Sequence, residues 1–196
     1  MMNVGLFFGV MGILSIIYLA LGWLASRNIK NHTDFFLAGR NLGVFAVTAT
    51  IIATQIGGGM FIGTAQDPFR GVLYIIGIVI GLLILGLSVA EKFRAFAIET
   101  VGDIFTQKYN STFLRFVCEI LSVTTLCGIL LAQALAAKSI VGYFVEVDSS
   151  FLFPLLWMTI VGYTLLGGLK AVIFTDILQV ILIITVFSGI FCYTIF

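Results

Sequence analysis

Six predominantly apolar stretches divide the chain into candidate membrane-spanning helices. They lie at about residues 3–26, 42–66, 71–91, 113–144, 150–168 and 176–196, with charged segments between most of them. Each stretch comes close to or exceeds the roughly 20 residues that a helix needs to cross the hydrocarbon core of a bilayer. We therefore predict an all-α polytopic membrane protein, with six transmembrane helices in a single transmembrane domain over residues 1–196.

The second stretch contains a pattern that does not favour a continuous helix. Two polar residues at mid-membrane depth are followed by three consecutive glycines: Thr54 and Gln55, then Gly57, Gly58 and Gly59. Each glycine costs about 1 kcal/mol relative to alanine in a helix, so we predict a break near residues 55–59. Such a break exposes carbonyls to a coupling ion in secondary transporters. Alternatively, the small residues only admit a neighbouring helix.

The segments between the spans carry local patterns of their own. Residues 99–109, ETVGDIFTQKY, suit a short surface helix, and Glu146 and Asp148 belong to an acidic loop. Gly167 and Gly168 end the fifth span, because paired glycines disfavour a continued helix. Lys170 then lies in the turn that leads to the sixth span.

Basic residues are distributed unequally between the two sides of the predicted membrane protein. With the N-terminus outside, eight of the ten basic residues are inside: Arg27, Lys30, Arg40, Lys92, Arg94, Lys108, Arg115 and Lys170. The outer segments hold Arg70 and Lys138. The positive-inside rule favours this orientation, and the charge that follows the first apolar run is unlike a cleaved signal peptide. We expect a plasma (inner) membrane protein with its N-terminus outside.

Composition supports the membrane assignment and disfavours catalysis. Hydrophobic residues make up 61% of the chain and charged residues 10%, whereas soluble domains carry about 25% charged residues. The three cysteines are an odd number in apolar stretches, which argues against a disulfide framework. The single histidine, His32, offers no cluster for metal binding or acid–base chemistry. No hydrolase, kinase, P-loop or zinc-protease motif occurs, so we expect neither an enzyme nor an organic cofactor.

Three polar residues near or within the spans each admit two roles. Glu119 follows Arg115 by one helical turn, a spacing that favours an ion pair over a functional acid. Gln133 either faces a solute pathway or makes an interhelical hydrogen bond. Asp176 precedes Gln179 by three residues, which is the pattern of a capping box at a helix start.

Four motifs occur in an order that resembles the sodium:solute symporter family. They are FLAGRNLG at residues 36–43, the glycine-rich second span, ETVGDIF at 99–105, and GGLKAV at 167–172 followed by Thr175, Asp176 and Gln179. Members of this family have a leucine-transporter-like core of two inverted five-helix repeats, preceded by one extra helix. The resemblance implies that this chain holds the extra helix and the first five-helix repeat, less than half of a usual member.

The resemblance also implies a sodium site and a pathway. In the family, backbone carbonyls at the break of the first core helix bind sodium, and the matching positions are Ala53 and Ile56. Oxygen ligands suit such a hard cation, and the remaining ligands come from a helix of the second repeat, which is absent here. Asp176 matches an acid near the inner route of the ion, a role compatible with helix capping. The expected solute or ion pathway comprises Thr54, Gln55, Gly57, Gly58, Gly59, Gln133 and Asp176.

The solute stays open among amino acids, choline-like cations and carboxylates. Proline-type members of the family have an acidic residue at the position of Gln55. The glycine run resembles the choline-type branch, but that branch has an aromatic residue where Gln55 stands. An aromatic ring provides the cation–π surface that a quaternary ammonium group uses.

The expected function is sodium-coupled symport of a small organic solute, by a chain that is an N-terminal portion and inactive alone. A single inverted repeat has no second repeat to move against. The alternative is a non-transporting membrane scaffold, or the remnant of a split or truncated symporter. A channel is disfavoured because no filter sequence is evident. Expected partners are the lipid bilayer, sodium, the solute and a missing C-terminal half or second chain, and no nucleic acid.

Overall fold

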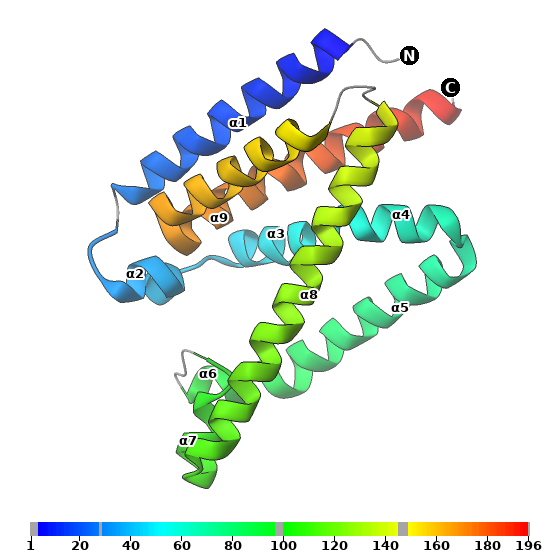
Figure 1. Ribbon diagram of the computed structural model, residues 1–196. Coiled ribbons are helices and arrows are strands. Elements are labelled where there is room, and N and C mark those ends of the chain that lie inside the picture. Colours follow the sequence, from blue (N-terminus) through cyan, green and yellow to red (C-terminus); the bar gives the residue numbers. More distant parts are fainter. Residues whose placement is uncertain (1–3, 28, 97–99, 145–148, 196) are drawn as a thin grey trace. The chain divides into compact units, whose positions relative to one another are not determined.

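The computed structural model of the chain describes residues 4–27, 29–96, 100–144 and 149–195, and these residues form helices without strands (Figure 1). The elements are α1 (Val4–Ser26), α2 (His32–Leu37), the 3₁₀ turn η1 (Ala38–Arg40), α3 (Val44–Gln55), α4 (Gly58–Gln66), α5 (Pro68–Ile84), the π-helical turn η2 (Leu85–Val89), α6 (Ala90–Ala95), α7 (Asp103–Tyr109), α8 (Thr112–Phe144) and α9 (Ser149–Ile195). The all-α prediction is confirmed. Five residues named or implied above lie outside the described residues: Asn3, Glu99, Glu146, Asp148 and Phe196.

The chain folds into two compact units. The first unit comprises Met1–Gly57 and Lys138–Phe196, and the second comprises Gly58–Ala137. The boundary at Gly57 falls between α3 and α4, within the glycine run of the second predicted span.

Helix α9 is a hairpin of two helical legs that meet at Gly168. Gly168 has φ +52° and ψ −148° inside an otherwise helical segment, and the two legs run back along each other in Figure 1. This positive φ suits glycine, which has no Cβ. A Cβ at Gly168 would lie 2.5 Å from the Phe35 carbonyl oxygen. The helix end predicted at Gly167 and Gly168 coincides with this reversal.

Among the residues that the structure describes, four helices are long and apolar enough to cross a membrane: Gly5–Ser26, Pro68–Ala95, Thr112–Gly142 and Trp157–Ile195. A fifth candidate arises if His32–Arg40 and Val44–Gln55, bent by 104°, are counted as one span. The structure thus supports a polytopic membrane protein.

The predicted count of six spans differs from these four or five candidates for two physical reasons. The candidate Trp157–Ile195 contains the reversal at Gly168 and overlaps both of the last two predicted spans. The predicted span 42–66 is divided into α3, of 12 residues, and α4, of 9 residues. At 1.5 Å per residue neither reaches about 30 Å alone. The count of six therefore stays a prediction.

The core of the first unit lies where α1 and α3 contact the legs of α9. Ala25 of α1 is fully buried against Tyr163 and Ala171 of α9. Gly22 allows this approach, because a Cβ there would lie 2.8 Å from the Cβ of Tyr163. Small residues at such contacts bring helix backbones together.

A second cluster joins α3 to the second leg of α9. Ala49 and Ala53 of α3 are buried with Val180 of α9, and Ile52 and Ile177 pack against them. Ala49 and Ala53 are one helical turn apart, so both face the same neighbour. Helix α3 is thereby fixed beside the part of α9 that follows the reversal.

The short helix α2 is tied to the reversal in α9 by an ion pair. Lys170 Nζ lies 3.1 Å from Asp34 Oδ1, and the Lys30 backbone N–H donates to Asp34 Oδ2 at 3.1 Å. The hydrogen bond from the Lys30 N–H, followed by that from the Lys170 ammonium, lowers the pKa of Asp34 below its usual value. Lys170 follows Gly168 by two residues and already belongs to the helix that resumes after the reversal, so the predicted turn at Lys170 is wrong.

In the second unit, Asp67 caps α5 and accepts a hydrogen bond from the Arg70 N–H at 3.1 Å.

The predicted surface helix is present as α7, and the Thr100 N–H donates to Asp103 Oδ2 at 2.8 Å. Arg115 Nε contacts Glu119 Oε1 at 2.7 Å, so the predicted ion pair is confirmed. The Arg115 guanidinium also lies 3.2 Å from Asp103 and links α7 to the start of α8.

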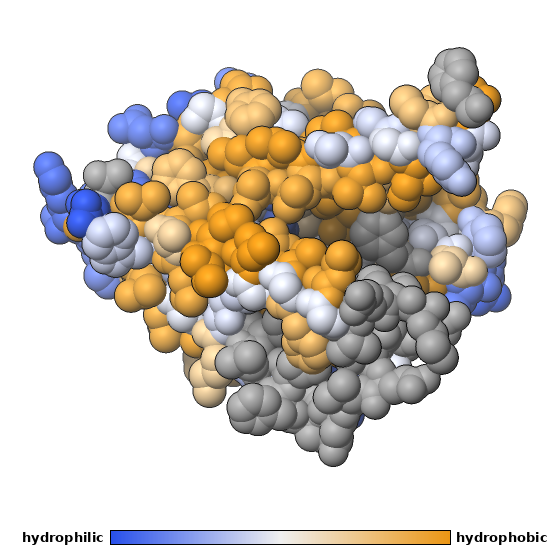
Figure 2. All heavy atoms as spheres, turned by 90° about the horizontal axis from the view of Figure 1, so that it is seen from above, coloured by the Kyte–Doolittle hydropathy of each residue, from blue (hydrophilic) through white to orange (hydrophobic). Residues whose placement is uncertain are grey.

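Apolar side chains cover much of the coloured surface in Figure 2. Over the described residues as a whole, exposed apolar side chains include Leu6, Leu87, Leu121 and Phe191, whose exposed fractions range from 61% to 87%. Soluble proteins rarely expose apolar patches of this extent. Lipid or other protein segments are therefore the expected surroundings of these helices.

Candidate functional site

The helix at the end of α3 is interrupted at Ile56 and Gly57. Ile56 has φ −87° and ψ 79°, although its N–H still donates to the Ile52 carbonyl at 2.9 Å. The Gly57 N–H donates to the Gln55 carbonyl at 3.1 Å, whereas a continuous helix would direct it to Ala53. The Ala53 carbonyl therefore lacks the backbone donor that a continuous helix provides, and it is available to another partner.

Ala53 lies beside the second leg of α9. Its side chain is 9% exposed and is clustered with Val180, and Val180 follows Asp176 by one helical turn. The structure thus brings the break in α3 and the acid of α9 into the same part of the first unit.

Asp176 is buried and incompletely paired. It is 8% exposed, and the Thr50 side chain of α3 interacts with its carboxyl group. Among the described residues, neither Asp176 Oδ2 nor Thr50 Oγ1 has a hydrogen-bond partner of normal geometry. Leaving a buried polar group unsatisfied costs about 1–3 kcal/mol. A cation, a proton or water would remove this cost.

Three polar groups of this region offer oxygen atoms: the Ala53 carbonyl, the Thr50 hydroxyl and the Asp176 carboxyl group. Sodium prefers such ligands to nitrogen or sulfur. Within the described ranges, no cluster of three or more His, Cys, Asp or Glu residues is placed to hold a metal ion.

The capping-box role predicted for Asp176 is wrong. The second leg of α9 starts directly after the reversal at Gly168, and residues 169–195 are helical. Asp176 therefore lies about two turns inside the helix, where the backbone N–H groups already have intrahelical partners. The prediction failed because it started the helix at the acid and not at the preceding glycines.

Two tyrosines complete the polar surroundings of Asp176. The Tyr18 hydroxyl of α1 lies near the Gln179 side chain, and the Tyr163 hydroxyl lies near the Thr175 side chain. Thr175 itself donates its hydroxyl to the Val172 carbonyl at 2.7 Å. The two tyrosine rings meet edge to face, with centroids 5.8 Å apart.

Sequence reasoning assigned no site role to Thr50, Tyr18 or Tyr163. A polar atom inside an apolar run was the available signal for each of them. That signal does not identify the partner, because Tyr18 and Gln179 are at opposite ends of the chain.

The remaining predicted pathway residues are divided between the two units. In the first unit, Thr54 is exposed and its hydroxyl donates to the Thr50 carbonyl at 2.7 Å. Gln55 and Gly57 are half-buried next to the break. The second unit contains Gly58 and Gly59 at the start of α4 and a half-buried Gln133 on α8. The pathway roles of all these residues stay predictions.

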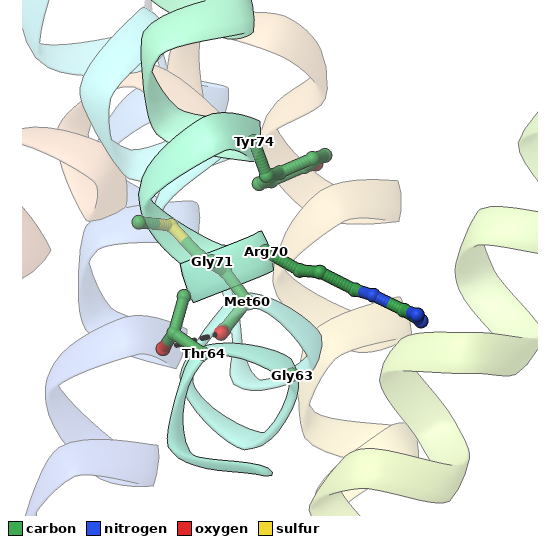
Figure 3. A pocket seen from close by; sticks show the side chains of 6 residues that line it. All are labelled: Met60, Gly63, Thr64, Arg70, Gly71 and Tyr74. Atoms are coloured by element: carbon green, nitrogen blue, oxygen red, sulfur yellow. Dashed lines mark hydrogen bonds between the residues drawn. The ribbon is translucent and has the colours of Figure 1, made fainter. Parts of the chain in front are cut away.

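A pocket of about 280 Å³ lies between α4 and α5 in the second unit (Figure 3). Its lining residues are Met60, Gly63, Thr64, Arg70, Gly71 and Tyr74. Arg70 pairs with Asp67 at 3.1 Å and its side chain is 86% exposed. In Figure 3 it extends away from the two helices. None of the predicted site residues lines this pocket.

Comparison with known proteins identifies a family and many curated relatives, one of which is described here. The model of the sodium:solute symporter family matches residues 35–196. High-affinity choline transporter 1 of Caenorhabditis elegans is 29% identical over 192 aligned residues, which cover 87% of this chain and 33% of the relative. The chain thus spans about one third of the length of that relative. No solved structure matches the chain.

Proposed function

Because the chain belongs to the sodium:solute symporter family, we propose that it forms the N-terminal part of a sodium-coupled symporter for a small organic solute. The observation that carries this proposal is the break after α3, which leaves the Ala53 carbonyl without its helical donor. Ala53 packs against Val180 of α9, one turn from the buried Asp176. Broken helices at such positions supply backbone carbonyls to coupling ions. The proposed activity is transport, coupled to sodium and without an organic cofactor.

In this proposal the carbonyls of Ala53 and Ile56 contribute one side of the sodium site. Both residues belong to the first unit, and the non-helical dihedral angles of Ile56 turn its carbonyl out of the α3 ladder. The other ligands come from a second repeat outside this chain, consistent with its covering one third of its curated relative.

In this proposal Asp176 and Thr50 bind the ion on its route to the inner side of the membrane. A carboxylate within a membrane is costly to bury unless it meets a cation or a polar partner, and such residues commonly mark ion pathways. Asp176 Oδ2 is both buried and without a partner of normal geometry among the described residues. Thr54, Gln55, Gly57, Gly58, Gly59 and Gln133 complete the proposed pathway for ion or solute.

The solute class can be identified by a competition assay, in which a panel of candidate solutes competes for uptake. The relative from C. elegans is named a choline transporter, and choline is therefore one member of the panel, beside amino acids and carboxylates. Gln55 offers no aromatic ring for the cation–π contact that a quaternary ammonium group uses. A solute of another class is therefore compatible with the residues at the break.

Asp176→Asn tests the ion route in the complete transporter that contains this chain. Labelled-solute uptake into proteoliposomes should saturate at a sodium concentration about tenfold or more above wild type, since a buried charged interaction is worth about 1.5–3 kcal/mol. Glu91→Gln, at an exposed position of α6, serves as the control. Wild-type uptake that does not depend on sodium would contradict the proposal. Unchanged sodium dependence in Asp176→Asn would contradict it as well.

The 196-residue chain alone is expected not to transport. A single inverted repeat lacks the second repeat against which it moves and the ligands that this repeat provides. Proteoliposomes that contain only this chain should show uptake equal to empty vesicles, with and without sodium. Sodium-stimulated uptake would instead indicate a dimer of half-transporters, and a complete protein without uptake of any panel solute would favour a scaffold.

A further inference from the structure

The end of α1 joins an apolar helix to a basic segment. Gly5–Ser26 is long and apolar enough to cross a bilayer, and residues 27–40, which follow it, contain three Lys or Arg residues and one acidic residue. We propose that this end of the first unit binds the headgroups of anionic phospholipids. The headgroup surface consists of Trp23, Arg27, Lys30 and Phe36. This inference does not depend on sodium coupling and goes beyond the proposed function.

Trp23 holds the Arg27 guanidinium at the end of the apolar helix. The two residues are one turn apart, and Arg27 Cζ lies 3.8 Å from the centroid of the Trp23 ring, which is a cation–π contact. Trp23 is in the last turn of α1 and is 52% exposed. Tryptophan near the end of a membrane helix lies at the level of the lipid headgroups. The planar guanidinium is thereby placed where it can bind a phosphate group through two hydrogen bonds.

A tight turn after α1 keeps Lys30 near Arg27. The Ile29 N–H donates to the Ser26 carbonyl at 3.2 Å. The Lys30 N–H donates to Asp34 Oδ2 at 3.1 Å, which fixes Lys30 at the start of α2. Three residues of chain span at most about 11 Å. Since the side chains of Arg27 and Lys30 are both exposed, the two cations belong to one small area of the surface.

The acidic residue of this segment is already paired with another helix. Asp34 Oδ1 lies 3.1 Å from Lys170 Nζ of α9, and each of these side chains is 22% exposed. Among the described residues, neither Arg27 nor Lys30 forms an ion pair with an acidic residue. Their positive charges are therefore available to an anionic partner.

Helix α2 adds an exposed aromatic ring to the same end of the first unit (Figure 1). Phe36 is 58% exposed, and its ring centroid lies 4.7 Å from that of His32, one turn away. Asp34, on the opposite side of this short helix, contacts α9 instead. Exposed aromatic rings beside basic residues are typical of protein surfaces that lie in the headgroup region of a membrane.

An anionic phospholipid matches both properties of the headgroup surface. Its phosphate group can bind the two cations, while its acyl chains continue along exposed apolar residues of α1 such as Leu19 and Leu24. A free anion would leave these apolar side chains uncovered. A zwitterionic lipid carries a positive group that weakens the attraction to Arg27 and Lys30.

Photo-crosslinking in the complete transporter that contains this chain tests the headgroup surface. The probe is phosphatidylglycerol with a photoreactive headgroup in phosphatidylcholine vesicles, and peptide mapping should find adducts within residues 23–36. Unlabelled phosphatidylglycerol should compete at least about fivefold more effectively than phosphatidylcholine, the preference that one basic residue near an anionic surface provides. Equal competition by the two lipids would overturn the inference, and so would adducts confined to other parts of the protein.

Arg27→Gln/Lys30→Gln should lower the adduct yield at limiting probe roughly tenfold or more, because two cations are lost. Arg70→Gln/Lys138→Gln is the matched control, since it also removes one arginine and one lysine from exposed positions. Its yield should stay within about twofold of wild type. Equal losses in the two variants would show a response to net charge alone and would overturn the inference.

Trp23→Leu keeps every charge of the segment, and it decides the question if the double variant does not insert into membranes. Loss of the cation–π contact should lower the adduct yield about two- to fivefold, and an unchanged yield would count against the headgroup surface. Inorganic phosphate should not displace the probe when chloride at the same ionic strength is the comparison. Displacement by phosphate would assign the cations to a free anion and overturn the inference.

Discussion

At the residue scale, the ion pair between Asp34 and Lys170 joins two parts of the chain that are far apart in sequence. Asp34 accepts hydrogen bonds from the Lys30 N–H and from Lys170 Nζ, both at 3.1 Å. Gly39, at φ +69°, leaves room for this carboxylate, since a Cβ there would lie 2.9 Å from Asp34 Oδ1. The pair therefore holds α2 beside the reversal of α9.

The ionisation of Asp34 predicts an acid-sensitive contribution to stability. Its folded pKa is lowered, first by the Lys30 N–H and then by Lys170, so its contribution is present above the unfolded pKa of about 3.9. The contribution is lost as pH falls through the lower folded pKa. Thermal unfolding in detergent should show Asp34→Asn less stable than wild type near pH 7, with the difference shrinking below about pH 4.

Glu91→Gln, on the exposed surface of α6, is the comparison for that experiment. A difference between Asp34→Asn and wild type that stays constant from neutral to acid pH would show that the charge of Asp34 is not what stabilises the contact.

Residue patterns predicted some contacts of the chain and could not predict others. The Arg115–Glu119 pair was predictable because one helical turn separates its members. The contact between the Tyr18 and Tyr163 rings was not, since it depends on α1 packing along α9, which no local pattern specifies. Asp176 was recognised as a site residue, but its neighbour Thr50 comes from another helix.

At the element scale, the reversal at Gly168 divides α9 into two helical legs. The glycine pair predicted the end of a helix, and the structure shows that the next helix begins at once. The carbonyl of Phe35 in α2 lies against the reversal, so the backbone conformation and the neighbouring helix both require a residue without a Cβ. The length of a hydrophobic run alone could not reveal this, because residues 157–195 are predominantly apolar on both sides of Gly168.

Gly168→Ala should destabilise the protein by about 2 kcal/mol or more. The backbone conformation φ +52°, ψ −148° is adopted almost only by glycine and costs other residues about 1–3 kcal/mol, and the added Cβ would lie 2.5 Å from the Phe35 carbonyl oxygen. Gly189→Ala in the same helix is the control, because a Cβ there meets nothing within 4 Å and alanine favours helix. Unfolding of both variants in detergent micelles measures the difference, and equal stability would show that the reversal tolerates a side chain.

At the scale of the whole molecule, the family and the helical fold were predictable, whereas the number of spans was not settled. Motifs between residues 36 and 179 indicated the sodium:solute symporter family, and the family match over residues 35–196 confirms it. Six predicted spans correspond to four or five candidate helices, because breaks at Ile56 and Gly168 change how segments are counted. The orientation in the membrane stays a prediction from charge.

Cysteine labelling tests that orientation in the complete transporter. In a background without Cys118, Cys127 and Cys192, Arg70→Cys should react with an impermeant maleimide in intact cells, because an outside N-terminus places this loop outside. Lys108→Cys, on the exposed part of α7, should react only after permeabilisation. The opposite pattern would reverse the topology.

In the predicted topology the reversal at Gly168 lies at the inner membrane surface, and it would then set the depth of Asp176 in the membrane. Eight residues separate the two, which is about 12 Å along the helix axis and roughly two fifths of the hydrocarbon thickness. A sodium ion that moves between the inner surface and Asp176 would therefore cross part of the transmembrane voltage, worth about 0.9 kcal/mol per 100 mV. Through this turn, the membrane potential itself would help to set how strongly Asp176 holds the ion.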